Sequence, residues 1–307
     1  MIRSALVRFL NNAFPVAMAK ARYKKWFKED LDLKNPQDLN AKILWQSLFA
    51  DTRVWSRLSD KYAVREFVKE RGCEKYLVKL YGKWDRVEDI DWDNLPDSFI
   101  FKSNTLSGHN IIVRDKKTMN WDDVKKELAS YLGPIKKAYS SEWQYQRIKP
   151  CIIAEELLIN DPEIAAISTS IIDYKVWCFN GKPYTFFVGA NRTKTNVNFY
   201  DYSLDWVNHP EHMVYNVHDL KPEHEIPKPK NIEEMLEVAK KLSEGFPLVR
   251  VDLFNIGGRI YFGEMTFTSN GGIQPFYSFE FCKEMGKHID ISMVKKDPKH
   301  WRGKGTY

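Results

Sequence analysis

Hydrophobic residues recur at helical spacing in the first third of the chain and at two later places. In residues 60–70, apolar positions three and four apart alternate with charged ones, which is typical of a helix with one buried face. Asn231 stands where a helix N-cap is expected. The helices predicted from this spacing cover 2–10, 42–48, 60–70, 121–132 and 231–245.

Shorter apolar runs, separated by turn residues, predict strands. Asn180-Gly181 lies between two such runs and is a strong signal for a tight hairpin turn, and Gly257-Gly258 separates another pair. Because these hairpins are interleaved with helices, the expected fold class is α+β and not a parallel doubly wound sheet. The predicted strands cover 78–82, 99–102, 111–113, 151–158, 173–179, 182–189, 248–255 and 259–268.

The composition narrows the class of protein. The 307 residues are 43% hydrophobic and 14% aromatic, which excludes a disordered chain. No apolar run approaches the roughly 20 residues that a membrane-spanning helix needs. The four cysteines are not spaced as metal or disulfide motifs, so we expect a cytoplasmic protein of a reducing compartment.

Positive charge is concentrated at the N-terminus. Residues 1–28 hold seven Lys/Arg and no acid, which leaves 40 basic against 41 acidic residues in the rest of the chain. A nucleic-acid surface needs basic residues spread over the fold, so no nucleic-acid partner is expected. Two interpretations of residues 1–28 stay open: a helix that touches an anionic inner membrane peripherally, or a helix packed on its own domain.

The last predicted hairpin carries the clearest candidate chemistry. Strand alternation places Arg250 and Asp252 on one face, and Glu264 and Thr266 on one face of the partner strand. Asp252 and Glu264 are expected to lie nearly opposite, where like charges repel unless a cation such as Mg²⁺ lies between them. The alternative is a solvated face on which Arg250 pairs with either acid. We expect the fold to survive removal of either acid, because the inner face of the hairpin supplies the packing. Removal of one acid also relieves its repulsion with the other.

Three lysines point to an anionic ligand. Lys102 ends a predicted strand and precedes a loop that contains Ser107-Gly108, whose backbone N–H groups could hold phosphates. Lys61 lies at the start of a predicted helix. Lys175 lies within a strand, where a cation without an anionic partner is costly.

Several ordered motifs resemble one known family. The carriers are N-P-x-x-L-N-A-K-I-L-W at 35–45, S-D-K-Y-A-V-R at 59–65, F-K-S-N at 101–104, I-A-E at 153–155, D-Y-K at 173–175, C-F-N-G-K-P at 178–183, N-F-Y-D at 198–201, R-V-D-L at 250–253 and Y-F-G-E-M-T-F at 261–267. Over roughly residues 30–290 the chain resembles the TupA-like (teichuronopeptide-biosynthesis) family of the ATP-grasp superfamily, which belongs to bacterial surface-polysaccharide loci.

The resemblance implies an ATP-grasp fold in which two α+β lobes enclose ATP, with Mg²⁺ as the second cofactor. The expected regions are a helical N-terminal region at 1–58, a catalytic region at 59–290 with its lobes meeting near residue 150, and a basic tail at 291–307. Nucleotide contacts are implied for Lys61, Lys102, Ser107 and Gly108, and the hinge around adenine and ribose for Glu155, Glu156 and Leu158.

Catalysis is implied for Arg250, which would steady the γ-phosphate, and for Lys175. The metal ligands implied are Asp252, Glu264 and Thr266, although the superfamily usually has Asn at the position of Thr266. We interpret the segment after the Asn180-Gly181 hairpin as a polar loop, which holds either the acceptor or only its own turns. Its candidate acceptor contacts are Arg192, Asn198, Tyr200 and Asp201.

The function implied is an ATP-dependent carboxylate–amine ligase. It would form an amide through an acylphosphate, from a sugar or polysaccharide carboxylate and an amine such as an amino acid. A glycosyltransferase with D-x-D at 89–91 or 91–93, a sugar phosphotransferase at the same ATP site and a non-catalytic assembly protein are the alternatives. His209, His212, His218 and His224 also gather in one segment, which we interpret as a polar loop and not a metal site.

Overall fold

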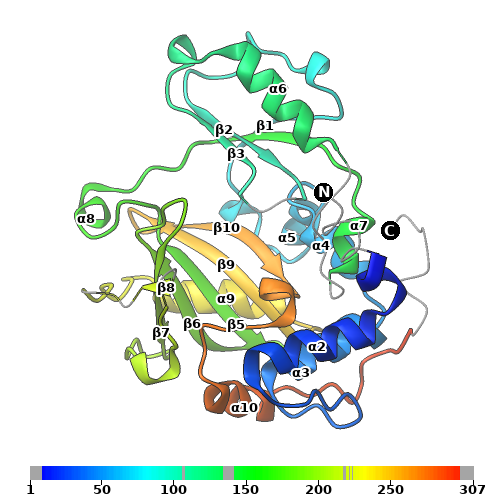
Figure 1. The fold of residues 1–307 in the computed structure, drawn as a ribbon. Helices are drawn as coiled ribbons and strands as arrows, with labels where there is room; N and C mark the ends of the chain where they lie inside the picture. The colour runs from blue at the N-terminus through cyan, green and yellow to red at the C-terminus, as the bar shows by residue number, and fades with distance from the viewer. Residues whose placement is uncertain are drawn as a thin grey trace.

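Two antiparallel sheets with helices packed on them form the protein (Figure 1). The computed structural model describes residues 9–105, 108–133, 142–216, 219–220, 222 and 224–297. This architecture confirms the expected α+β class. The predicted helix at 2–10 lies almost wholly outside the described residues, and the predicted regional boundaries stay a prediction.

The smaller sheet has the strand order β1-β4-β2-β3. Its strands are β1 (Leu80–Trp84), β2 (Phe99–Ser103), β3 (Asn110–Val113) and β4 (Ile152–Glu155). Helix α6 (Trp121–Tyr131) covers one face, where Val124, Leu128 and Tyr131 pack with Phe99 and Phe101. The strand predicted to reach residue 158 ends at Glu155. Glu156 and Leu158, which were predicted to belong to the hinge around adenine and ribose, therefore lie outside β4.

The larger sheet has the order β10-β9-β5-β6-β7-β8 and is antiparallel except between β7 and β8. Its strands are β5 (Asp173–Phe179), β6 (Lys182–Ala190), β7 (Val197–Tyr202), β8 (Asp219–Leu220), β9 (Leu248–Ile256) and β10 (Arg259–Thr266). The two hairpins predicted from Asn180-Gly181 and Gly257-Gly258 are confirmed. The polar loop predicted at 198–201 is wrong, because these residues form β7 within the sheet.

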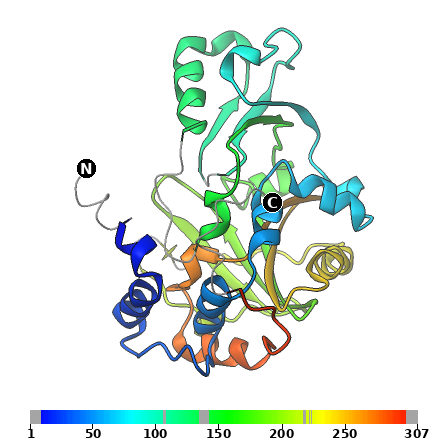
Figure 2. The same cartoon turned by 90° about the vertical axis from the view of Figure 1, so that its right-hand side faces the viewer.

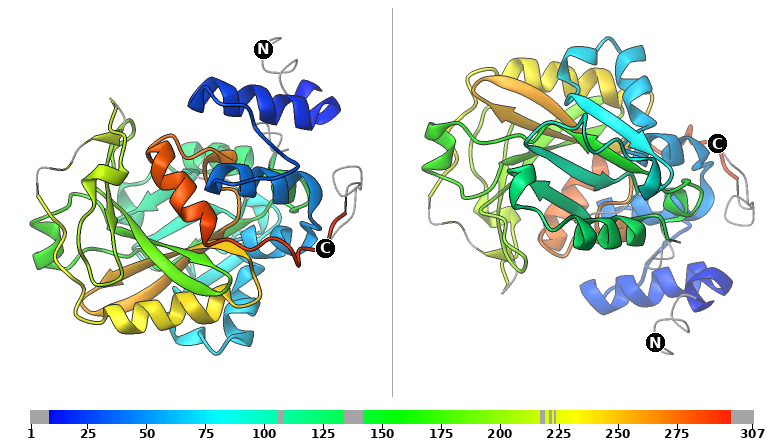
Figure 3. Two further views of the ribbon diagram at one scale, coloured as in Figure 1. Left: turned by 90° about the horizontal axis from the view of Figure 1, so that it is seen from below. Right: turned by 90° about the horizontal axis from the view of Figure 1, so that it is seen from above.

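Both faces of the larger sheet are covered. Helix α9 (Ile232–Ser243) packs on one face through Met235, Val238 and Leu242. On the other face lie α3 (Leu39–Phe49) and α10 (Phe279–Lys287), which are side by side although they come from opposite ends of the chain (Figures 1 and 3). The Lys42 ammonium joins them by donating to the Gly286 and Ile289 carbonyls at 2.7 and 2.6 Å.

Helix α2 (Pro15–Phe27) is the outermost element of the N-terminal region (Figures 2 and 3). Its Ala19 and Tyr23 are buried in a cluster with residues of α3, so part of this basic segment packs on the protein's own body. The remaining short helices are α4 (Arg53–Ser59), α5 (Val64–Glu70), α7 (Trp143–Gln146) and α8 (Pro162–Ala165), with 3-10 helices η1 (Glu74–Tyr76), η2 (Val87–Asp89), η3 (Lys116–Thr118), η4 (Pro210–His212) and η5 (Ser269–Gly272).

The helix predicted to begin at residue 60 begins at Val64. The Asp60 carboxylate accepts hydrogen bonds from the backbone N–H groups of Tyr62 and Ala63 at 2.8 and 3.2 Å, and this turn delays the first helical residue. No helix of the described part of the chain is long and apolar enough to cross a bilayer. All four cysteines are buried and free.

Candidate active site

A polar cavity of about 370 Å³ lies where the two sheets meet, with residues of β2 and β4 on one side and of β5, β9 and β10 on the other. Ten of its lining residues are charged, an unusual density for a protein interior. The basic ones are Lys61, Arg65, Lys102, Lys175, Arg192 and Arg250. The acidic ones are Glu155, Asp173, Asp252 and Glu264. Gly108, which was predicted to lie near phosphates, also lines this cavity.

A β-bulge sets the register of the β9–β10 hairpin. The pairing runs regularly from the turn to Phe262, then skips Gly263 and places Glu264 opposite Asp252. A side chain at Gly263 would put its Cβ 3.0 Å from the Asp252 carbonyl oxygen and 3.3 Å from the Phe254 ring, so glycine allows this close approach. The predicted opposition of the two acids is therefore confirmed, and the bulge is its cause.

Asp252 is held by two cations. Arg250 donates from Nε and Nη2 to its two oxygens, both at 2.7 Å, and the Lys175 ammonium lies 2.8 Å from Oδ2. Burial alone would raise the pKa of Asp252, but Arg250 and Lys175 outweigh it and hold this pKa below its usual value. The alternative of an Arg250–acid pair thus describes the contact correctly, although the sheet face is buried and not solvated.

Glu264 is the more accessible acid of the pair, with 41% of its side chain exposed. The Thr266 hydroxyl donates to Glu264 Oε1 at 3.0 Å and accepts from Arg250 Nη2 at 3.3 Å. Thr266 therefore holds Glu264 and Arg250 in place. The two carboxylates offer hard oxygen donors side by side, which fits a Mg²⁺ ion, and the role of Thr266 as a metal ligand stays a prediction.

On the smaller sheet, Glu155 lies between two further cations. Its carboxylate oxygens accept from Lys102 Nζ at 2.8 Å and from Arg65 Nη1 at 3.0 Å. Glu155 thus presents its side chain to the cavity, whereas Glu156 and Leu158 are not among the lining residues. The Glu156 backbone N–H donates to the Lys79 carbonyl at 2.9 Å and continues the chain past β4.

Lys61 is placed by the turn that precedes α5. Its backbone N–H donates to the Asn104 carbonyl at 3.0 Å, which ties it to the end of β2 near Lys102. Burial lowers the pKa of the Lys61 ammonium, with Glu264 and Glu155 opposing this shift. Ser107, the predicted phosphate contact beside Gly108, lies outside the described residues.

The predicted acceptor residues separate into two places. Arg192 lines the cavity and donates to Asp173 at 2.8 Å, and Asp173 lies 3.5 Å from Lys175. Asn198, Tyr200 and Asp201 lie on β7 and are not among the lining residues. The side chains of Tyr200 and Asp201 are buried and bonded within the protein, so their prediction as loop residues is wrong.

Sequence reasoning missed two charged residues of this cavity. Arg65 lies four residues after Lys61, the spacing of one turn in the helix predicted at 60–70. Asp173 precedes Lys175 by two residues and so shares its strand face. Both stand inside motifs that were used for the family resemblance. Their spacing from the predicted lysines was the signal that could have identified them.

The comparisons with known proteins agree with the resemblance. The family model for TupA-like ATPgrasp proteins matches residues 41–290. The chain therefore belongs to the TupA-like ATP-grasp family, as its motifs predicted. No curated protein matches it significantly in sequence.

Several solved structures are similar at low identity. An N5-carboxyaminoimidazole ribonucleotide synthetase with ADP shows 11% identity and a TM-score of 0.43, covering 70% of this chain and 46% of that one. D-alanine–D-alanine ligase from Bacillus anthracis with ATP shows 14% identity and a TM-score of 0.43, and the match covers 78% of this chain and 64% of that one. An L-amino acid ligase from Bacillus licheniformis shows 10% identity and a TM-score of 0.43, and the match covers 72% of this chain and 43% of that one. The chain spans about half to two thirds of the length of these proteins.

Proposed function

We propose that this chain uses ATP to activate a carboxylate and join it to an amine on a bacterial surface polysaccharide or its precursor. The observation that carries the proposal is the cavity between the sheets, where six cations and four carboxylates surround one space. Phosphoryl transfer needs such fixed charges, because its catalysis consists mostly of positioning and electrostatic stabilisation. Membership of the TupA-like ATP-grasp family supports the same reaction class.

The cations would bind the phosphates by exchanging partners. Lys102, Arg65 and Lys175 each lie at hydrogen-bonding distance from a carboxylate of the protein, so their charge is already compensated without ligand. A triphosphate offers more negative charge at the same distance and would replace part of these contacts. Arg250 would then remain as the buried cation that steadies the transferring phosphoryl group.

Glu264 and Asp252 would hold Mg²⁺, which supplies charge neutralisation at the phosphates when bound. In the reaction, a carboxylate oxygen of the substrate takes the γ-phosphoryl group and ADP leaves. The amine nitrogen then attacks the acyl carbon, the bond to the phosphate oxygen breaks, and an amide, phosphate and a proton result. Arg192 lies at the more exposed rim of the cavity and would bind the anionic acceptor, while Asp173 fixes its position.

Equilibrium binding of ATP with Mg²⁺ tests the nucleotide site. We expect Lys102→Met to weaken binding at least tenfold, which is about 1.4 kcal/mol. Lys75→Met is the matched control, because Lys75 also pairs with a carboxylate but lies at the surface, 2.7 Å from Glu234. Equal affinity of the two variants would overturn the nucleotide assignment.

Product analysis tests the reaction class. With mixtures of uronic acids and amino acids as substrates, ligase activity releases ADP and free phosphate together, whereas a sugar phosphotransferase yields ADP and a phosphosugar. The D-x-D of a glycosyltransferase has little support here, because Asp91 accepts bonds from the Asn94 backbone N–H and side-chain amide at 3.4 and 2.6 Å within a surface turn.

We also propose that the exposed side chains of α2 touch anionic membranes. Ala19 and Tyr23 pack α2 on the body of the protein, while Lys25 and Trp26 near its end and Phe14, which precedes it, are exposed. Aromatic and basic side chains together suit a lipid headgroup layer. Co-sedimentation with anionic vesicles at low salt should exceed that with neutral vesicles and fall in Trp26→Ser. Equal retention by both vesicle types would contradict the contact.

A further inference from the structure

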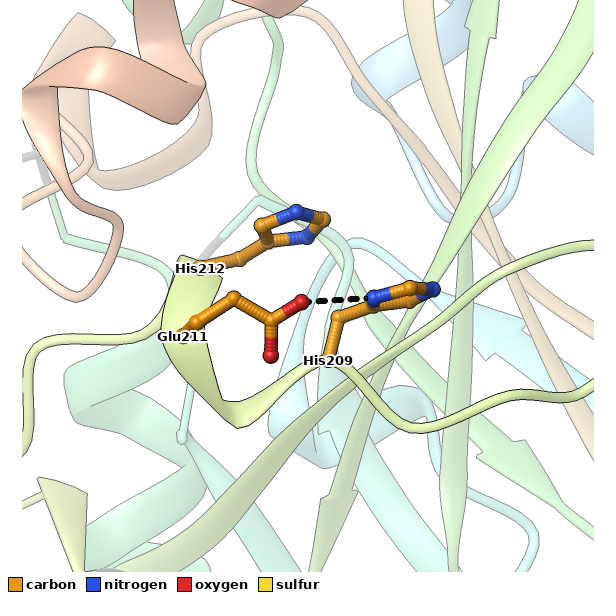
Figure 4. A group of neighbouring side chains, drawn as sticks. All are labelled: His209, Glu211 and His212. Carbon is orange, nitrogen blue, oxygen red and sulfur yellow. Dashed lines mark hydrogen bonds and ion pairs between the residues drawn. The ribbon is translucent and has the colours of Figure 1, made fainter.

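Two histidines and a glutamate converge at η4 (Figure 4). One ring nitrogen or carboxylate oxygen from each of His209, Glu211 and His212 lies within 4.8 Å of the others. The two imidazole rings are stacked with their centroids 4.8 Å apart, and His209 Nδ1 lies 2.8 Å from Glu211 Oε1. None of the three residues lines the charged cavity.

The backbone around this cluster is fixed on both sides. The His209 N–H donates to the Asp201 carbonyl on β7 at 2.8 Å, and the His212 carbonyl accepts from the Ser278 N–H at 2.8 Å. Pro210 occupies the first turn of η4 and restricts its conformation. Residues 210–212 are thus a 3-10 turn, anchored to the sheet and to the segment before α10, within the segment predicted as a polar loop. His218, which was predicted in the same segment, lies outside the described residues.

A buried carboxylate orients one of the histidines. Asp201 Oδ2 lies 2.8 Å from His212 Nδ1, and its Oδ1 accepts from the Thr185 and Tyr277 hydroxyls at 3.1 and 3.2 Å. Asp201 is only 1% exposed, so this arrangement is rigid. With Nδ1 engaged, Nε2 is the nitrogen left to bind an ion, and a carboxylate behind a histidine is the usual second partner of a metal-binding imidazole.

The opposite side of the cluster is open to solvent. The side chains of His209 and His212 are 30% and 27% exposed, and that of Glu211 is 65% exposed. A Zn–N bond is about 2.0–2.1 Å, so two nitrogens on one ion lie at most about 4.2 Å apart. An imidazole binds an ion in the plane of its ring, and the two rings now lie within 14° of parallel. Binding therefore requires His209 to turn out of this stack and to exchange its hydrogen bond with Glu211 for a bond to the ion. The exposed side chains of His209 and Glu211 leave room for that rotation.

From this arrangement we propose that His209, Glu211 and His212 form a binding site for a first-row transition-metal ion such as Zn²⁺. Two imidazoles and one carboxylate suit Zn²⁺ and its neighbours, whereas Mg²⁺ prefers ligands that are all oxygen. Three protein ligands leave a coordination position for water or a further ligand. The ion would join η4 to β7 and to the segment before α10. Strand β7 is three strands away from β9, which carries Asp252.

Equilibrium dialysis of the full chain against Zn²⁺, after removal of metals by chelation, tests the site. Millimolar Mg²⁺ is present throughout so that the oxygen ligands of the candidate active site do not compete for zinc. We expect one bound Zn²⁺ per chain at micromolar free metal, with affinity lowered at least about tenfold in His209→Ala and in Glu211→Gln. Both variants keep the Asp201–His212 pair, so the local fold is retained.

His288→Ala is the matched control, because His288 also lies near a glutamate, with Nε2 3.4 Å from Glu284, but on the surface of α10. Binding in this control should equal the wild type. Binding of Co²⁺ should also give a visible absorption band that His209→Ala weakens. Absence of bound zinc at micromolar concentration, or equal binding in His209→Ala and the control, would overturn the proposal and leave the cluster as an ordinary ion pair.

Discussion

Replacement of Asp252 by asparagine should destabilise the protein strongly. The change keeps the size of the side chain but removes the charge that Arg250 and Lys175 share. Their side chains are only 9% and 11% exposed, so water cannot replace the lost carboxylate. The amide nitrogen of asparagine would also face a donor and not an acceptor.

The magnitude follows from this burial. Breaking a buried ion pair by removal of one partner costs about 3–5 kcal/mol, because an uncompensated charge remains inside the protein. Glu264→Gln is the control: its side chain is 41% exposed and lies 3.8 Å from Arg250, so we expect a cost below about 1 kcal/mol. The sequence predicts that removal of either acid leaves the fold intact, because the hairpin's inner face supplies the packing. The cations around Asp252 reverse that expectation for this residue.

Urea unfolding at pH 7 without nucleotide, followed by circular dichroism, measures both free energies of unfolding. Because the pKa of Asp252 lies below its usual value of about 3.9 in the folded protein, its contribution is complete above that pH and is lost as the pH falls through the folded pKa. The difference between wild type and Asp252→Asn should therefore shrink below about pH 4. If both variants cost less than about 1 kcal/mol at pH 7, the argument from buried charge is refuted.

Three further predictions concern a close-packed glycine, a helix cap and the buried thiols. Gly286→Ala should lower the free energy of unfolding in urea by about 1–3 kcal/mol, because its Cβ would lie 2.0 Å from the Gln37 carbonyl oxygen. The control Gly133→Ala should be nearly neutral, because its Cβ would meet nothing closer than 3.4 Å. Equal costs for the two variants would contradict the close approach at Gly286. Asp38→Ala should cost about 1–2 kcal/mol because Asp38 caps α3, whereas Asp38→Asn should keep most of that stability; a neutral alanine variant would count against the cap. The four buried thiols should resist iodoacetamide at pH 8 until the protein unfolds. Burial raises the pKa of the thiols of Cys151, Cys178 and Cys282 to about 12, so little reactive thiolate is present. Rapid alkylation of the native protein would contradict this prediction.

The parts of the fold that sequence predicted are those that local rules determine. The hairpins at Asn180-Gly181 and Gly257-Gly258 follow from turn residues and neighbouring apolar runs. Strand β7 escaped notice because its polar Asp201 is as buried as its aromatic neighbours, so no alternation marks the strand. An aspartate at this position is typical of a loop, and only its contact with His212 explains why Asp201 is buried in a strand.

The candidate site shows the same division. Strand alternation places Arg250 and Asp252 on one face, but a regular register counted from the turn would put Gly263 opposite Asp252 and Glu264 on the other face. The bulge at Gly263 is what brings Glu264 to the face of Asp252. The bulge depends on contact between Gly263 and the facing backbone, which no local pattern reports. The pairing of Arg65 with Glu155 joins residues 90 positions apart and depends on the order of strands in the smaller sheet.

The contact between α3 and α10 has a consequence for synthesis of the protein. The Lys42–Gly286 hydrogen bond joins residues 244 positions apart, so α3 leaves the ribosome long before its partner exists. At about 5–20 residues per second, this interval lasts about 12–50 s. During that time the apolar side of α3, including Leu39 and Ile43, has no native partner from α10. The nascent chain therefore carries an uncovered apolar helix that chaperones can bind, and the larger core closes only once α10 has been made.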